Sequence, residues 1–278
     1  MPIVLGLAAA LSYGAADFLG GTAAKRVGPA AVVLFSQAIG LTVFLLFLPL
    51  FIDDGLTSGS AAWAGLSGLV GAVGVGLLYR GLAAGRMSVV APVSAVVGAT
   101  VPVVVALTTG ESPTSMQLVG VLVALVAVAL VSATPERDPG AGRRRGLPEA
   151  FGAGLAFGIF FLTFNEAGDQ GGVWPLVVAR LASVALFGAI ALLGRRRVRF
   201  ERGVRLPIAA TGVLDLAANL CFLLGSQRGL LSIVAVLTSL YPGTTVLLAR
   251  VVLRERMTPL QSGGLVAALV GIALITAG

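Results

Sequence analysis

Three ionisable residues lie inside long apolar stretches of the sequence, namely Asp17, Arg180 and Asp215. Within a membrane a charged side chain is costly, so it usually faces a water-filled cavity or a partner of opposite charge. The guanidinium of arginine matches a carboxylate or a phosphate, whereas an aspartate can take up a proton or bind an amine. We therefore expect Arg180 to bind an anionic group of a solute, and Asp17 or Asp215 to bind a proton or a cationic group. A buried pair between Arg180 and one of the carboxylates, present only for packing, is the alternative.

Uncharged polar residues accompany these charges. Tyr13 precedes Asp17 by four residues and Asn219 follows Asp215 by four, so each pair shares one face of a helix. Further candidates for binding a solute or a proton lie in other apolar stretches: Ser36, Gln37, Tyr79, Ser94, Tyr241 and Thr244. We expect a central cavity, with the tyrosines supplying aromatic walls and hydroxyl groups.

Three prolines lie within two of the apolar stretches. Proline lacks a backbone N–H and weakens the hydrogen-bond ladder of a helix. Pro92, Pro102 and Pro242 are therefore candidate hinges for a conformational change. Static kinks that neighbouring helices tolerate are the alternative.

The composition indicates whether the segments that contain these residues lie in water or in a membrane. The 278 residues are 57% hydrophobic and only 11% charged, whereas a soluble domain has about 25% charged residues. Such a chain could not cover a soluble surface, and its mean hydropathy is +1.01. This excludes a soluble enzyme, a disordered chain and a nucleic-acid binder, and predicts an integral membrane protein.

The apolar stretches are long enough to be membrane-spanning helices, each of which needs about 20 residues. Gly, Pro and charge clusters divide the chain into ten such segments, which we predict to be ten transmembrane helices in an all-α protein. The segments lie near residues 3–24, 30–52, 61–83, 88–109, 115–134, 149–168, 173–194, 205–227, 231–250 and 258–277.

The two halves of the sequence align with each other at an offset of 144 residues, without a gap. This offset pairs uncommon residues as well as apolar ones: Ser88 with Ser232, Glu111 with Glu255, Thr114 with Thr258 and Gln117 with Gln261. We predict two five-helix repeats, at 1–134 and 149–278, joined by a basic linker at 135–148. Because five is odd, the second repeat enters the membrane in the opposite orientation, an arrangement found in many secondary transporters.

A repeated motif precedes the fifth and tenth predicted helices. Thr114 with Gln117, and Thr258 with Gln261, fit a capping box. We expect the preceding Glu111 and Glu255 to lie in tight hairpins at the membrane surface, where a carboxylate can pair with a helix dipole.

The segments that run from the fourth to the fifth and from the ninth to the tenth predicted helix resemble those of the drug/metabolite transporter superfamily, specifically its ten-span bacterial members with two EamA-type repeats. The stretch from Leu253 to Gln261 fits the family pattern Leu-x-Glu-x-x-x-x-x-Gln, whereas Thr109 to Pro113 in the first repeat has its proline displaced. The resemblance covers essentially the whole chain. It implies a secondary transporter that moves a small metabolite or drug-like solute by alternating access. Relatives export or import their solutes, so the direction stays open; we expect an exporter, and the deep carboxylates make a proton the candidate coupling ion. The solute itself is not implied, because relatives carry many kinds.

Two other functions are less favoured by the residues. A channel-like facilitator would use the same helices without alternating access. A membrane-embedded lipid-modifying enzyme would need clustered acidic residues or histidines, yet the chain has no histidine and its only adjacent acidic pair is Asp53 and Asp54. We expect no enzymatic activity, no cofactor and no metal. The expected partners are the lipid bilayer and a small solute, with a proton in the coupled case; nucleic acid is not expected, and the chain would be a monomer or a homodimer.

The distribution of basic residues predicts the orientation. Of the 19 basic residues, all but Arg180 and Arg228 lie in connections that follow odd-numbered predicted helices. The positive-inside rule places those connections in the cytoplasm. We therefore expect a multi-pass protein of the plasma membrane with both termini outside the cytoplasm.

Overall fold

The computed structural model describes residues 1–51, 55–84, 87–131, 146–193, 202–253 and 258–278. These residues are almost entirely helical, and none of them forms a strand. The first half contains five α-helices: α1 (Pro2–Val27), α2 (Pro29–Phe47), α3 (Ser58–Ala84), α4 (Met87–Thr108) and α5 (Ser115–Val131).

The second half repeats this order with one difference. Its helices are α6 (Leu147–Gly171), α7 (Trp174–Leu193), α8 (Arg205–Ser226), α9 (Leu231–Thr238), α10 (Tyr241–Leu253) and α11 (Pro259–Ala277). At the offset of 144 residues, α9 and α10 together correspond to α4. Short 3-10 helices at Leu48–Phe51 and Arg202–Val204 adjoin α2 and α8.

Six helices, namely α1, α2, α3, α6, α7 and α8, are long and apolar enough to cross a membrane. Four shorter apolar stretches lie at Val93–Thr108, Ser115–Leu130, Leu231–Thr245 and Pro259–Ile275. These ten segments coincide with the ten that the sequence predicts. The four shorter ones are not long enough to be identified as membrane spans by their length. The described architecture is therefore all-helical, with six clear spans.

Both predicted capping boxes are confirmed. The Thr258 hydroxyl accepts from the Gln261 backbone N–H at 3.2 Å, while the Gln261 side chain accepts from the Thr258 N–H at 3.0 Å. Thr114 and Gln117 make the same two bonds at 3.2 and 2.9 Å. These reciprocal bonds satisfy backbone donors that a helix start leaves unpaired, and so they define where α5 and α11 begin.

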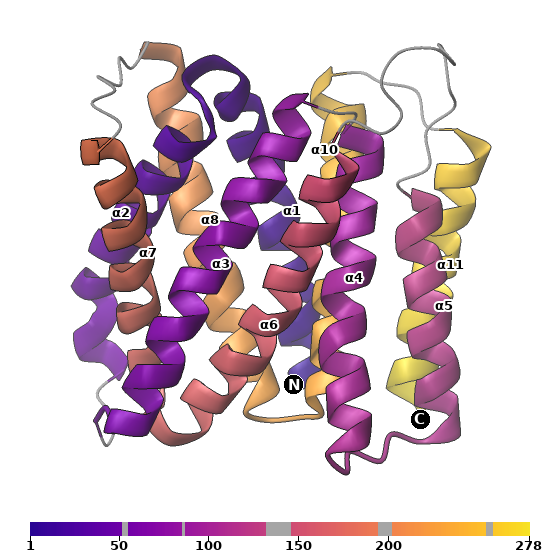
Figure 1. Cartoon of the computed structure of the whole chain (residues 1–278). Coiled ribbons are helices and arrows are strands. Elements are labelled where there is room, and N and C mark those ends of the chain that lie inside the picture. The colour runs from indigo at the N-terminus through magenta and orange to yellow at the C-terminus, as the bar shows by residue number, and fades with distance from the viewer. Residues whose placement is uncertain (52–54, 85–86, 132–145, 194–201, 254–257) are drawn as a thin grey trace.

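Helices of each half pack against helices of the other half, and the pattern is symmetric. α3 packs along α6, and its counterpart α8 packs along α1; α4 also packs along α6, as α9 and α10 do along α1. Two further pairs, α2 with α7 and α5 with α11, join each helix to its own counterpart. Figure 1 shows both termini at one edge of the bundle, with α1 starting there and α6 starting at the opposite edge. The halves are thus interleaved rather than side by side.

Small residues allow these helices to approach closely. A Cβ on Gly14 of α1 would overlap the Tyr241 carbonyl oxygen and the side chain of Thr244. At the equivalent position in the second half, a Cβ on Gly158 of α6 would overlap Val101 of α4. The same requirement for glycine therefore acts at both repeat-related crossings.

The fourth helix is continuous in the first half and interrupted in the second. α4 runs unbroken from Met87 to Thr108, across Pro92 and Pro102, whereas its counterpart is interrupted at Ser239 and Leu240. Pro242 cannot donate a backbone hydrogen bond, and bonds of the tighter i to i+3 type run from Leu240 to Leu237 and from Gly243 to Leu240 around it. Of the three predicted hinge prolines, only Pro242 adjoins a break in a helix.

Candidate functional site

A cavity lies at the centre of the bundle, between helices of both halves. Its volume of about 80 Å³ is several times the roughly 10–15 Å³ that one water requires. Its polar lining comprises Tyr13, Asp17, Gln37, Ser67, Ser94, Arg180, Ser183, Asp215, Asn219, Ser239 and Tyr241. Four phenylalanines of α6 also line it: Phe157, Phe160, Phe161 and Phe164.

The strongest interaction at the cavity is an ion pair between α7 and α8. Arg180 Nη1 lies 2.5 Å from Asp215 Oδ2, and the Arg180 side chain is only 4% exposed. Gln37 of α2 completes a triangle: its Oε1 accepts from Arg180 Nη1, and its Nε2 donates to Asp215 Oδ2 at 3.2 Å. A buried guanidinium requires such compensation, so the structure identifies Asp215 as the partner of Arg180.

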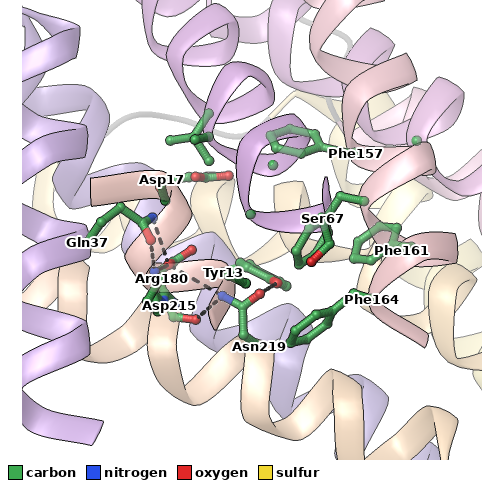
Figure 2. Close-up of a pocket in the computed structure, with 18 of the residues that line it drawn as sticks. Tyr13, Asp17, Gln37, Ser67, Phe157, Phe161, Phe164, Arg180, Asp215 and Asn219 are labelled. Atoms are coloured by element: carbon green, nitrogen blue, oxygen red, sulfur yellow. Dashed lines mark hydrogen bonds and ion pairs between the residues drawn. The ribbon is translucent and has the colours of Figure 1, made fainter. Parts of the chain in front are cut away.

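Hydrogen bonds extend this pair to α1. Asn219 Nδ2 donates to the Asp215 carbonyl oxygen at 2.6 Å, and the Tyr13 hydroxyl donates to Asn219 Oδ1 at 2.8 Å. Figure 2 shows the resulting chain of contacts along one side of the cavity. The network thus joins two helices of the first half, α1 and α2, to two of the second, α7 and α8.

Asp17 faces the same cavity but stands outside this network. Its carboxylate makes no hydrogen bond or ion pair with any residue that the structure describes. In an apolar surrounding, an unpaired carboxylate favours a bound proton or cation. Asp215 already has a cationic partner in Arg180, so among the described residues Asp17 is the acidic side chain at the cavity without one.

Repeat-related positions of both halves line the cavity. The offset of 144 residues relates Tyr13 to Phe157, Asp17 to Phe161, Asp215 to Gly71 and Asn219 to Val75, and all eight residues line the cavity. The members from α1 and α8 are polar, and their counterparts from α6 and α3 are apolar. A symmetric scaffold thus encloses an asymmetric, amphipathic cavity.

The apolar wall is rich in aromatic rings. Phe160 and Phe164 stack with their centroids 5.0 Å apart, and Phe160 lies 5.5 Å from Phe161. Phe161 also contacts Phe222 of α8 at 4.5 Å. Such rings bury large apolar area, so this wall suits an apolar or aromatic part of a solute.

The structure gathers most, though not all, of the predicted binding residues at the cavity. Ser94 and Tyr241 line it with their hydroxyl oxygens 3.1 Å apart. Ser36 instead donates to the Val33 carbonyl oxygen at 3.2 Å. Tyr79 packs against Gly20 and Thr244 against Gly14, both away from the cavity.

Several lining residues did not stand out in the sequence. The phenylalanines resemble ordinary core residues there, and Ser67, Ser183 and Ser239 resemble ordinary helix serines. One signal was available for Ser183, because it lies three residues after Arg180 and therefore on the same helix face.

The model of the EamA-like transporter family matches residues 1–133 and again residues 144–277. The chain belongs to the EamA-like transporter family. That family is part of the drug/metabolite transporter superfamily, so the resemblance predicted from the sequence is confirmed. The chain is accordingly a multi-pass membrane transporter of this type.

The transporter also has a structural relative. A solved crystal structure aligns with a TM-score of 0.78 over 99% of this chain and 96% of the other, at 18% sequence identity. At that identity the likeness is one of fold. A comparison with curated proteins finds no match.

Proposed function

We propose that the transporter is a secondary carrier that exports a small metabolite or drug-like solute by alternating access. It would use ten membrane spans in two inverted repeats and couple export to protons. The observation that supports this most directly is the amphipathic cavity, which repeat-related residues of both halves enclose and which contains a buried ion pair beside an unpaired carboxylate. A cavity shared between two halves changes its access when one half moves against the other.

The charges suggest how proton and solute would engage. In this proposal Asp17 binds the proton, or a cationic group of the solute that competes with it, and Arg180 binds an anionic group. The network from Tyr13 to Gln37 holds Arg180 and Asp215 in place while the cavity is empty of solute. The break at Ser239 and Leu240 provides the bending point on the side of α9 and α10.

The orientation follows from the positive-inside rule. We propose a plasma-membrane location with both termini outside the cytoplasm. The edge of the bundle that carries both termini in Figure 1 is then the outer face.

Reconstituted proteoliposomes test the function. Purified protein would be assayed for counterflow and pH-gradient-driven uptake with panels of radiolabelled amino acids, nucleosides, sugars and cationic drugs. We expect saturable transport of one class, and Asp17→Asn to reduce gradient-driven accumulation at least about tenfold. The matched control is Asp169→Asn, at an exposed position of α6, which should keep the wild-type rate of accumulation.

Two results would contradict the proposal. Wild-type accumulation in Asp17→Asn would remove Asp17 as the coupling residue. Unitary currents that do not saturate with solute would show a channel in place of a carrier.

A further inference from the structure

Two buried polar atoms without partners lie on successive turns of α7. Arg180 Nη2 and Ser183 Oγ make no hydrogen bond with any described residue, and their residues are 4% and 3% exposed. Both residues line the central cavity. A third such atom, Thr238 Oγ1 in α9, belongs to a residue that does not line it. Buried polar groups are nearly always hydrogen-bonded, so a pair of exceptions at one cavity points to a ligand.

The hydroxyl of Ser183 differs from those of comparable serines. A serine within a helix commonly donates to a carbonyl oxygen three or four residues earlier. Ser67 does so to Ala64 at 2.8 Å, and Ser94 to Ala91 at 2.9 Å, although both line the same cavity. Ser183 lacks this bond, and its donor is therefore available.

The guanidinium of Arg180 is engaged at one end only. Nη1 binds both Asp215 and Gln37, whereas Nη2, the other arm of the fork, is unused. Ser183 follows Arg180 by three residues, which places both donors on one face of α7. Two donors on one face suit the oxygens of a planar anion.

We propose that Arg180 Nη2 and Ser183 Oγ form a binding subsite for a carboxylate group of the transported solute, an inference that rests on the proposed carrier function. A monoanion fits better than a phosphate dianion, because Asp17 and Asp215 already place two carboxylates at the same cavity.

The remainder of this solute is apolar. In Figure 2 the labelled phenylalanines of α6, Phe157, Phe161 and Phe164, lie across the cavity from Arg180. A solute with its carboxylate at α7 would therefore direct an apolar or aromatic body towards α6. The substrate class is an amphipathic monocarboxylate, and Ser183 is a residue that determines its specificity.

A binding measurement with two matched probes tests this subsite. The probes are 3-phenylpropionate and its neutral isostere 3-phenylpropanamide, titrated onto the full chain in lipid nanodiscs with no gradient present. We expect the wild type to bind the carboxylate at least about tenfold more tightly, since a hydrogen bond to a charged group contributes that much. Ser183→Ala should lower this preference about tenfold and leave the affinity for the amide unchanged. Ser226→Ala in α8 is the control, because its hydroxyl is already bonded to the Leu223 carbonyl oxygen and the residue does not line the cavity, and it should keep the wild-type preference.

A second variant protects the test against a folding defect. Ser183→Cys keeps the shape of the side chain with a slightly larger atom but is only a weak donor, so it should lose the carboxylate preference while binding the amide normally. Equal affinities of the wild type for both probes would overturn the subsite. So would a full carboxylate preference in both Ser183 variants.

Failure of the subsite and failure of the carrier function can be told apart. If the probes bind without preference while proteoliposomes still transport another solute in an Asp17-dependent manner, only the subsite is wrong. If the preference depends on Ser183 but no solute is transported, the carrier function is wrong and the subsite stands.

Discussion

The carboxylate of Glu111 caps α9 through Ser232, which lies in the other half of the chain. Glu111 Oε2 accepts from the Ser232 hydroxyl at 2.5 Å and from its backbone N–H at 3.2 Å, while Oε1 accepts from the Leu231 N–H at 2.6 Å. Leu230, at the N-cap of α9, provides no side-chain bond. A distant carboxylate therefore supplies the cap that the local sequence lacks, and it binds the turn after α4 to the interrupted helix.

Removing this charge should destabilise the transporter. We expect Glu111→Gln to lower the free energy of unfolding by about 1 kcal/mol, the usual contribution of a helix cap. Thermal unfolding in detergent would show this as a lower midpoint. Glu166→Gln, at an exposed position of α6, is the matched control, and equal midpoints for the two variants would refute the role of the cap.

The ion pair between Arg180 and Asp215 should behave as a unit. Arg180→Gln alone leaves a carboxylate without its cation, which costs about 3–5 kcal/mol at a buried site. The double variant Arg180→Gln, Asp215→Asn should be more stable than Arg180→Gln, because no uncompensated charge remains. A double-mutant cycle of chemical unfolding measures this coupling, and additive effects would show that the two residues are independent.

The close contact of α1 with α10 predicts a strict requirement at Gly14. We expect Gly14→Ala to destabilise the protein by about 1–3 kcal/mol through overpacking, because its Cβ would overlap Tyr241 and Thr244. Gly65→Ala in α3 is the control, since no atom outside its own helix turn lies within 4 Å of the added Cβ. That change should be neutral or stabilise by roughly 0.5–1 kcal/mol. Similar losses at both positions would argue against the packing.

Labelling of single cysteines tests the orientation. With the lone Cys221 replaced by Ala, Thr57→Cys should react in intact cells with a membrane-impermeant maleimide, and Lys25→Cys should react only after the cells are opened. Both positions are exposed; Thr57 directly precedes the start of α3, and Lys25 lies in the last turn of α1. The reverse labelling pattern would invert the proposed topology.

Much of the architecture could be predicted from the sequence because it depends on local properties. Apolar runs broken by glycine, proline and charge predicted the helices, and the capping boxes at Thr114 and Thr258 needed only residues three apart. The 144-residue offset predicted two repeats. Asp17, Arg180 and Asp215 stood out because a charge within an apolar run is visible without any knowledge of its neighbours.

Only the tertiary structure decided which side chains meet. Arg180 could have paired with Asp17 or with Asp215, and the packing of α7 against α2 and α8 brings it to Asp215 and Gln37. Glu111 was expected at a helix dipole, but the helix that it caps, α9, begins 120 residues away in sequence; Glu255, for which the same was expected, lies outside the described residues. The four polar and four apolar residues related by the repeat form one amphipathic cavity because the halves are interleaved. Such contacts depend on how distant helices cross, and helix periodicity within one segment carries no information about that.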